Sequence, residues 1–431
     1  MGTKISRLES EVIKTPLEWR FLAWLEVLER LLSSPQSAEM TLNQYFRERS
    51  GFGPQERADL ADGVYGLLRK WYWLLQWAPI TAPRRLILAY WSRTLGMASR
   101  ELLPLMNAEE QLWMQHIKAQ PLSQELSIQS DLPDFVIQSL RARYQDSEIL
   151  ELGRSLQQPG TLDLRVNTWR MSRAEALSQL QLEYSAESTP FSPFGIRMKG
   201  KPALYQHPLM KNGIIEVQDE GSQLLGMLVE PKRREMVADL CAGAGGKTLH
   251  FGALMNNQGR VYAFDISKKR LEALKPRLKR SGLSNIHPVL LNHERSDRLS
   301  RLAGKMDRVL VDAPCSGLGT LRRNPELKWR HNAETVAELV LKQQSILQAA
   351  ARLVKPGGRL VYATCSLLVQ ENEAQAAWFN QNFPDFVVVN VSDCLSQINW
   401  SKADDPYLRL SPLSHHTDGF FAAVWQRLPH A

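Results

Sequence analysis

The sequence predicts an α/β protein in which a mostly parallel, doubly wound sheet follows a small α+β unit and a helical N-terminal region. Three observations lead to this fold class. From residue 231 to 431, short β-branched runs alternate with helical periods, as in parallel strands joined by crossover helices. Residues 156–230 mix the two kinds of element. Residues 1–155 show helical spacing with few β-branched residues, so we expect three domains with these boundaries.

The elements are expected in the following order. Apolar residues recur at three- and four-residue spacing in 17–32 and 56–77, which predicts helices there. After Pro159-Gly160, the α+β unit is predicted as a strand (161–169), a helix (172–182) and a strand leading into a helix (214–229). The strands expected in the C-terminal region are 235–241, 259–267, 286–292, 307–314, 359–366, 386–392 and 419–428. Its expected helices are 247–257, 268–282, 337–358 and 371–383.

The composition limits the classes of protein that fit. A formal net charge of +8 is compatible with a polyanionic partner such as nucleic acid, and equally with a basic enzyme that binds none. Four cysteines without a C-x-x-C pair indicate reduced thiols and no zinc site. No apolar run approaches the ~20 residues of a membrane span, and no signal peptide is evident. We expect a cytoplasmic protein without metal or membrane partner, and a monomer.

A glycine-rich loop, "CAGAGGKT", follows the first strand of the predicted sheet. The P-loop pattern would need a glycine where Cys241 stands, and the dinucleotide pattern would need one where Thr248 stands. The next strand ends at Asp265, and an acidic residue there typically bonds a ribose hydroxyl. A ligand that carries adenosine and lacks a pyrophosphate fits, and S-adenosylmethionine is such a ligand. NAD, an ATPase site and a turn without ligand remain the alternatives.

Two cysteines follow successive predicted strands, Cys315 in "DAPCSG" and Cys365 in "ATCS". A lone cysteine at a strand end is commonly a small buried hydrophobe. Two neighbouring ones favour a reaction that needs a thiolate beside a methyl donor, namely methylation of cytosine at C5. The thiolate adds to C6, C5 becomes nucleophilic, and a carboxylic acid near N3 assists. The residues alone do not choose which cysteine is the nucleophile.

Seven ordered segments between residues 160 and 428 resemble the Nol/Nop/Sun family of RNA cytosine-C5 methyltransferases. They are "CAGAGGKT", "FDIS", "DAPCSGLGTLRRNPELKW", "KQQSIL", "LVKPGGRLVYATCS", "QENE" and "DGFFAAVW". The upstream "RVN" and "VQDEGSQ" resemble the region that precedes the catalytic domain in that family. In the N-terminal third, "ERADLADGVYGLLRKW" resembles the NusB-like helical domain of the bacterial Sun/Fmu rRNA enzymes, which implies an RNA-binding role.

The resemblance implies a Rossmann-like class I methyltransferase domain with a seven-stranded sheet, and it implies roles for single residues. Cys365 is the nucleophile, Cys315 assists elimination and product release, and Asp312 contacts the base and borders the donor. The S-adenosylmethionine site that it implies is Cys241, Ala242, Gly243, Ala244, Gly245, Gly246, Lys247, Asp265, Asn292 and Asp312.

Two positions depart from the family pattern. The family loop usually reads C-A-A-P-G-G-K, whereas Gly243-Ala244 replaces Ala-Pro here. After the third strand the family usually has an Asp that faces the adenine, and this chain has Asn292. Both changes bear on the affinity for the donor, and neither touches the cysteines.

The expected partner is RNA, and 16S ribosomal RNA is the expected substrate. Arg322, Arg323 and Lys328 directly follow the "PCSG" motif and are the candidate phosphate contacts. The seven basic residues of 268–282 are interpreted instead as a solvated outer face. The alternatives are a tRNA cytosine-C5 methyltransferase, a non-catalytic RNA-binding assembly factor and a DNA methyltransferase.

Overall fold

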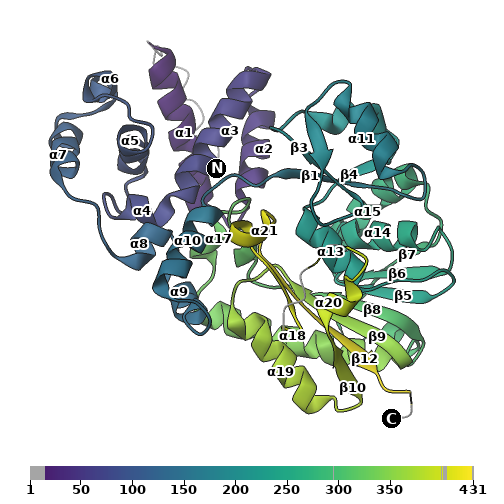
Figure 1. Cartoon of the computed structure of the whole chain (residues 1–431). Helices are drawn as coiled ribbons and strands as arrows, with labels where there is room; N and C mark the ends of the chain where they lie inside the picture. The colour runs from purple at the N-terminus through teal and green to yellow at the C-terminus, as the bar shows by residue number, and fades with distance from the viewer. Residues whose placement is uncertain (1–14, 295, 399, 401–404, 430–431) are drawn as a thin grey trace. The chain divides into compact units, whose positions relative to one another are not determined.

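The structure is a computed structural model that describes residues 15–294, 296–398, 400 and 405–429, and the chain forms two compact units (Figure 1). Unit 1 contains the residues up to 137 together with 144–158 and 321–330. Unit 2 contains residues 138–143, 159–320 and those from 331 onwards. The predicted α+β region and the predicted parallel sheet both lie in unit 2.

Unit 1 is helical, and its core is built around the fully buried rings of Trp24, Trp71 and Trp91. Its first helix begins where the Thr15 hydroxyl accepts a hydrogen bond from Glu18 N, with Pro16 in the first turn. Its helices are α1 (Pro16–Ser33), α2 (Ala38–Glu48), α3 (Pro54–Arg69), α4 (Trp71–Leu75), α5 (Pro83–Arg93), α6 (Ser99–Leu102), η2 (Leu103–Leu105), α7 (Ala108–Ala119), α8 (Leu126–Ser130), α10 (Asp146–Leu156) and α17 (Leu327–Arg330); α9 (Asp134–Leu140) continues into unit 2.

A small antiparallel sheet opens unit 2. Its strand order is β2-β3-β1-β4, so the first strand in the chain is central. Buried apolar residues such as Leu164, Leu180 and Ile196 pack between this sheet and its helices. The elements are β1 (Leu162–Val166), α11 (Arg173–Gln181), β2 (Ala186–Ser188), β3 (Gly195–Met198), η3 (Leu204–Gln206), α12 (Pro208–Lys211) and β4 (Ile215–Val217).

The second sheet of unit 2 has the order β10-β12-β9-β8-β5-β6-β7, with β11 paired to β12. The five strands from β9 to β7 are parallel, and β12 runs antiparallel to both of its neighbours in that order. The strands are β5 (Met236–Leu240), β6 (Arg260–Asp265), β7 (Ile286–Leu290), β8 (Met306–Asp312), β9 (Val354–Thr364), β10 (Phe386–Val389), β11 (Leu408–Leu410) and β12 (Phe420–Arg427).

Helices cover both faces of this sheet, because successive side chains of each strand point to opposite sides (Figure 1). One face packs against α13 (Glu220–Leu228), α14 (Gly246–Leu254), α15 (Lys268–Ser281) and α20 (Val391–Cys394). The other packs against α16 (Asp297–Ser300), α18 (Ala333–Leu353) and α19 (Glu373–Asn382). The remaining short elements are η4 (Leu318–Thr320), η5 (Val369–Glu371) and α21 (Pro412–His415). The predicted fold class is confirmed.

Several predicted elements have different bounds in the structure, and two of these differences have a clear local cause or consequence. The helix expected at 337–358 begins at Ala333, capped by the Asn332 side chain, and ends at Leu353. A proline disfavours helical geometry in the residue before it, so Pro356 explains the early end better than the glycines after it. The strand expected at 386–392 ends at Val389, and the next residues form α20.

Among the helices of the described ranges, none combines the length and the apolar character that crossing a membrane requires.

Candidate active site

The glycine-rich loop joins β5 to α14 at the carboxyl edge of the parallel sheet. Its turn uses left-handed backbone at Cys241, Gly243 and Gly245, with φ of 67°, 60° and 80°. Gly245 also packs closely, because a Cβ atom there would lie 2.2 Å from a methyl carbon of Leu274. Glycine is therefore required at 245 for two reasons, conformation and space.

Asp265 holds this loop against the end of β6. One carboxylate oxygen accepts a hydrogen bond from Gly243 N at 2.8 Å, and the other accepts one from Ser267 N at 2.7 Å. Ala242 N donates to Phe264 O at 2.9 Å. Asp265 is buried, and each of its oxygens retains a lone pair for a ligand hydroxyl.

Two arginines hold the carbonyl groups on the other side of the loop. Arg277 of α15 donates to Ala244 O at 2.7 Å, and Arg165 of β1 donates to Gly246 O at 2.5 Å. Glu216 of β4 accepts from Arg277 at 2.9 Å and so fixes its orientation. The small sheet thus supports the loop, and these contacts stiffen a turn that lacks the proline expected from the family pattern.

A cavity of about 370 Å³ lies beside this loop, which is within the usual size range of a small-molecule site. Its lining includes Cys241 and Asp265 from the loop region, and Leu291 and Glu294 from the segment after β7. Asn292, expected at this site, is exposed and is not among the lining residues. The other lining residues are Leu240, Phe264, Ile266, Ser267, Arg270, Leu299, Pro314, Lys342, Ile346 and Ala349.

Lys247 connects the loop to the end of β8. Its ammonium group lies 2.8 Å from Asp312 Oδ2, and it is largely buried while Asp312 is about one-third exposed. Burial lowers the pKa of Lys247, but the charge and hydrogen bond of Asp312, with smaller contributions from Asp239 and Cys365, raise it above its usual value overall. The lysine therefore stays charged and brings Asp312 to the edge of the site.

The two cysteines predicted to react lie side by side. Their strands β8 and β9 are parallel neighbours, with Asp312 opposite Ala363. The sulfur atoms of Cys315 and Cys365 are 3.5 Å apart, and both cysteines are free and partly buried. The hydrogen bond with Cys365 and burial raise the pKa of Cys315 well above its ordinary value, and the charges of Cys365 and Glu371 add to the effect. Cys315 is therefore a neutral thiol at physiological pH.

A buried carboxyl group that the sequence reasoning missed links the two cysteine loops. Glu371 accepts hydrogen bonds from Ser316 and Ser366, the residues that follow the two cysteines, and from Gln343. The signals for it were present, since Glu371 belongs to "QENE" and Gln343 to "KQQSIL". Both segments contributed to the resemblance, but neither was given a role.

The structure corrects the expected RNA contacts. Lys328 is 2% exposed and forms an ion pair with the buried Asp131 inside unit 1. Arg322 is 4% exposed. Side chains this deeply buried do not reach a phosphate in this structure, so the expectation is dropped for both. Arg323 is half-buried and stays a prediction.

In the described part of the chain, no group of three or more His, Cys, Asp and Glu side chains is placed to hold a metal ion.

A doubly wound sheet with an antiparallel strand among the parallel ones, and with a cavity at the carboxyl ends of β5 and β6, is the architecture of an α/β methyltransferase. The comparisons with known proteins narrow this class. Residues 226–426 match the family described as 16S rRNA methyltransferase RsmB/F, and residues 132–204 match the ferredoxin-like domain of RsmF/B-like methyltransferases. The chain belongs to the RsmB/F methyltransferase family.

Curated relatives and solved structures agree with this assignment. A probable ribosomal RNA small subunit methyltransferase B of Synechocystis sp. is 36% identical over 300 residues, which is 69% of this chain and 67% of the relative. The protein of the same description in Bacillus subtilis is 35% identical over 61% of this chain and 59% of its own length. The crystal structure of PH0851 has a TM-score of 0.78 and 25% identity, with 95% of this chain and 98% of that chain covered. A methyltransferase homolog from Pyrococcus horikoshii has a TM-score of 0.57 and 26% identity, with 69% and 100% covered.

Proposed function

We propose that this protein transfers a methyl group from S-adenosylmethionine to C5 of a cytosine in RNA through a covalent bond between Cys365 and C6 of the base. The observation that carries the proposal is the pair of free thiols 3.5 Å apart at the ends of two parallel strands. The donor cavity and the Lys247–Asp312 ion pair lie at the same edge of the sheet. A scaffold protein has no need of such a pair.

The residues around the cavity fit S-adenosylmethionine. The oxygens of Asp265 suit the ribose hydroxyls, and the glycine-rich backbone allows close approach of a ligand. Lys342, Arg270 and Glu294 at the rim offer charged and hydrogen-bonding groups. When bound, the donor supplies an electrophilic methyl group.

The two thiols differ in their surroundings, and this difference supports the assignment of roles. Lys247 is close enough to Cys365 for the two groups to interact electrostatically. Cys315 remains protonated beside Glu371. Cys365 therefore attacks C6, and Asp312 hydrogen-bonds the base so that C5 becomes nucleophilic. After methylation, a base accepts the C5 proton and the Cys365 thiolate leaves C6, which restores the aromatic ring; Cys315 assists this elimination and the release of product.

Small-subunit ribosomal RNA is the proposed substrate, and the cytoplasm is then the place of action. The support is that relatives at about 35% identity are described as ribosomal RNA small subunit methyltransferase B. The target cytosine has to be unpaired or flipped out of its stack, because neither C5 nor C6 can be attacked within a stacked helix.

The test uses tritium-labelled S-adenosylmethionine with unmodified small-subunit rRNA or tRNA. Wild-type protein is expected to label rRNA, Cys365→Ala to give no label, and Cys315→Ala to accumulate a protein–RNA adduct. Digestion to nucleosides then identifies 5-methylcytosine. Label on tRNA alone would reject rRNA as the substrate. Label retained in Cys365→Ala would mean that the roles of the two cysteines are exchanged. RNA that binds but takes no label would reject the proposal that the protein is a methyltransferase.

A further inference from the structure

Glu371 ends the short turn η5, and its side chain is completely buried between the two cysteine loops. Oε1 accepts hydrogen bonds from Ser316 N and from Gln343 Nε2, both at 2.9 Å. Oε2 accepts from the hydroxyls of Ser316 and Ser366, both at 2.5 Å. A carboxylate has about four acceptor positions, so these four bonds use its capacity. All four donors, in the described part of the chain, are uncharged.

These bonds hold the backbone on both sides of each thiol. Ser316 directly follows Cys315, and the Gln343 amide that contacts Glu371 also donates to Pro314 O at 3.1 Å. The residue before Cys315 and the residue after it are therefore both fixed to one network.

Cys365 is held in a similar way. The hydroxyl of Ser366, the next residue, lies 3.1 Å from that of Ser316, and the Cys365 carbonyl accepts from Gly319 N at 2.8 Å. The two loops are thus bound to each other as well as to Glu371. A shift of one loop would break bonds of the other.

We infer that Glu371 is the positioning residue that fixes the two thiols against each other and makes Cys365, rather than Cys315, the nucleophile. This inference rests on the proposed function and deepens it. The hydrogen bonds of Glu371 fix the spacing of the two sulfur atoms, and its charge makes the two thiols unequal. The buried carboxyl group of Glu371 near Cys315 disfavours a negative charge on Cys315.

The full-length protein with Glu371→Gln tests the inference, and Glu373→Gln is the matched control. Glu373 lies two residues further on, at the start of α19, where it pairs with Arg409 at 2.7 Å and belongs to no part of the thiol network. The glutamine keeps the shape of Glu371, removes the charge and places an N–H group against donors.

The first measurement is alkylation of each cysteine by iodoacetamide from about pH 6 to pH 10, resolved by mass spectrometry without RNA or donor. In wild type, Cys365 is expected to react well before Cys315. In Glu371→Gln the ratio of the two rates should fall about tenfold, because one pKa unit changes the thiolate fraction tenfold. Glu373→Gln should behave as wild type. A folded Glu371→Gln protein with the wild-type ratio overturns the inference.

The second measurement is steady-state methyl transfer. A misplaced thiol is expected to lower kcat in Glu371→Gln on the order of 10²-fold with KM for RNA unchanged. If Glu371→Gln does not fold, Ser366→Ala is the second variant, because it removes one hydrogen bond to Glu371 and keeps the carboxylate charge. Ser366→Ala should lower kcat about tenfold, and Cys365 should still be alkylated before Cys315. A wild-type kcat in Ser366→Ala would overturn the positioning role of Glu371. A wild-type protein that shows the alkylation asymmetry and methylates no RNA would reject the proposed reaction while the positioning inference stands.

Discussion

Asp239 lies near the C-terminal end of β5, where its side chain is buried and only one of its oxygens has a partner. Oδ2 accepts a hydrogen bond from the Thr248 hydroxyl at 2.5 Å, whereas Oδ1 has none in the described part of the chain. Burial raises the pKa of Asp239 to about 7, with the neighbouring charge of Asp312 adding to the effect and Thr248 opposing it. The folded protein therefore keeps this proton over a range in which the unfolded chain has lost it.

This difference predicts how stability depends on pH. Between the unfolded value of 3.8 and about 7, the folded state binds more protons at Asp239, so the free energy of unfolding falls as pH rises through this window. Asp239→Asn should remove the dependence and be more stable than wild type at pH 8, by up to about 4 kcal/mol. Urea unfolding of both proteins at about pH 5 and pH 8 checks this. A stability difference that is the same at both values contradicts it.

Glu294, rather than the expected Asn292, is among the residues that line the cavity beside the glycine-rich loop. Its carboxylate lines the donor cavity and accepts from the Ser345 hydroxyl at 3.0 Å. A hydrogen bond from its own backbone lowers the pKa of Glu294, with Ser345 and the charge of Lys342 contributing and partial burial opposing. It is therefore an ionised acceptor, suited to the exocyclic amine of an adenine.

We predict that Glu294→Gln weakens binding of S-adenosylhomocysteine about 10- to 100-fold, the usual range for a hydrogen bond to a charged group. Asn292→Ala should change the affinity little. Calorimetry with S-adenosylhomocysteine and with its inosine analogue measures the affinity for each ligand and therefore the preference for the adenine base. This preference should be smaller in Glu294→Gln than in the wild-type protein. A larger loss in Asn292→Ala would restore Asn292 as the adenine contact.

At the scale of elements, two glycines of the glycine-rich loop allow the cost of backbone strain to be measured separately from the cost of a steric overlap. Gly243 and Gly245 both have positive φ, but a Cβ atom at 243 would find its nearest neighbour at 4.0 Å, whereas at 245 it would overlap Leu274. Gly243→Ala should therefore cost about 1 kcal/mol of stability, from backbone strain alone. Gly245→Ala should cost more and also weaken donor binding, because α14 and α15 must separate.

Thermal unfolding and calorimetry with S-adenosylhomocysteine measure the two effects. Equal losses in both alanine variants would show that the contact with Leu274 adds nothing to the conformational cost.

The sequence predicted the parts of this site that local chemistry determines. Strand runs, helix periods and the glycine turn placed the loop, Asp265 and both cysteines correctly at one edge of the sheet, because parallel strands share their carboxyl ends. It could not assign a role to Glu371, because the role depends on bonds to residues 55 and 28 positions away in the chain. For the same reason, Arg165 was given no role and Arg277 was wrongly interpreted as part of a solvated outer face, although they reach the loop from β1 and α15.

The segment 321–330 illustrates a second limit. It directly follows the Cys315 loop, and its basic residues suggested a role in the same crevice. Instead it belongs to unit 1, where the ring of Trp329 lies 4.4 Å from that of Trp71 and Glu326 accepts from Ala38 N. A charged segment of the sequence gives no indication that its lysine is a core residue, because the partner Asp131 is 197 residues away.

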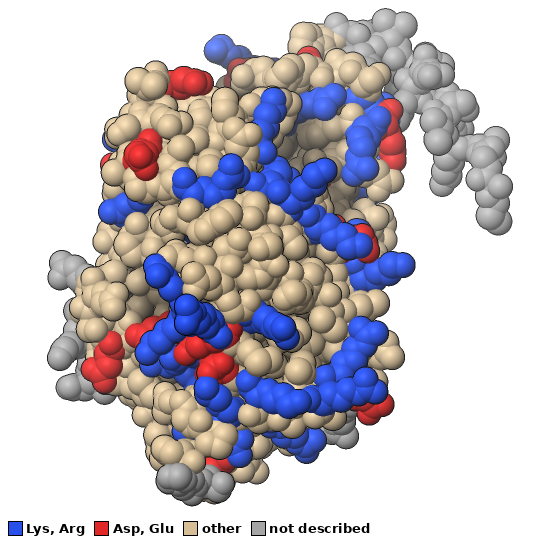
Figure 2. Space-filling model, turned by 90° about the vertical axis from the view of Figure 1, so that its right-hand side faces the viewer, with Lys and Arg blue, Asp and Glu red and all other residues tan. Residues whose placement is uncertain are grey.

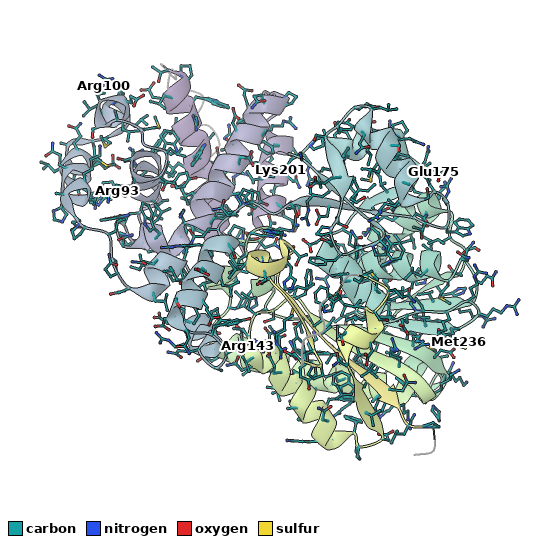
Figure 3. All side chains as sticks on the ribbon, viewed as in Figure 1. Arg93, Arg100, Arg143, Glu175, Lys201 and Met236 are labelled. Carbon is teal, nitrogen blue, oxygen red and sulfur yellow. The ribbon has the colours of Figure 1, made fainter. Side chains whose placement is uncertain are left out.

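At the scale of the whole molecule, the positive charge is unevenly shared. Unit 1 contains 20 Lys and Arg and 20 Asp and Glu, whereas unit 2 contains 33 and 25, so the net charge of +8 lies in unit 2. Figure 2 shows many Lys and Arg side chains on the side that carries α11 and α15. Some basic side chains of unit 2 already have an acidic partner within the protein. Arg277 and Arg280 of α15 pair with Glu216. Arg143, labelled in Figure 3, pairs with Glu373 and Asp405. General attraction of RNA is therefore expected to come from unit 2.

Variants of the ion pair between Lys328 and Asp131 test whether Lys328 is a structural residue of unit 1 rather than an RNA contact. Burial lowers the pKa of Lys328 and raises that of Asp131, each partly offset by the other's charge, so the pair is stable only when complete. Lys328→Met or Asp131→Asn alone should lower the stability of unit 1 by about 3–5 kcal/mol, because one buried charge loses its partner. The double variant should recover most of this loss.

RNA binding by the double variant then separates a structural lysine from a phosphate contact. Each phosphate contact contributes about 0.7–0.9 to the slope of log affinity against log salt. Since Lys328 is buried within unit 1, the double variant should keep the wild-type slope when RNA binding is titrated at several salt concentrations. A slope reduced by about that amount in a fully folded double variant would mean that Lys328 leaves its buried site to bind RNA, and the role first expected from the sequence would be restored.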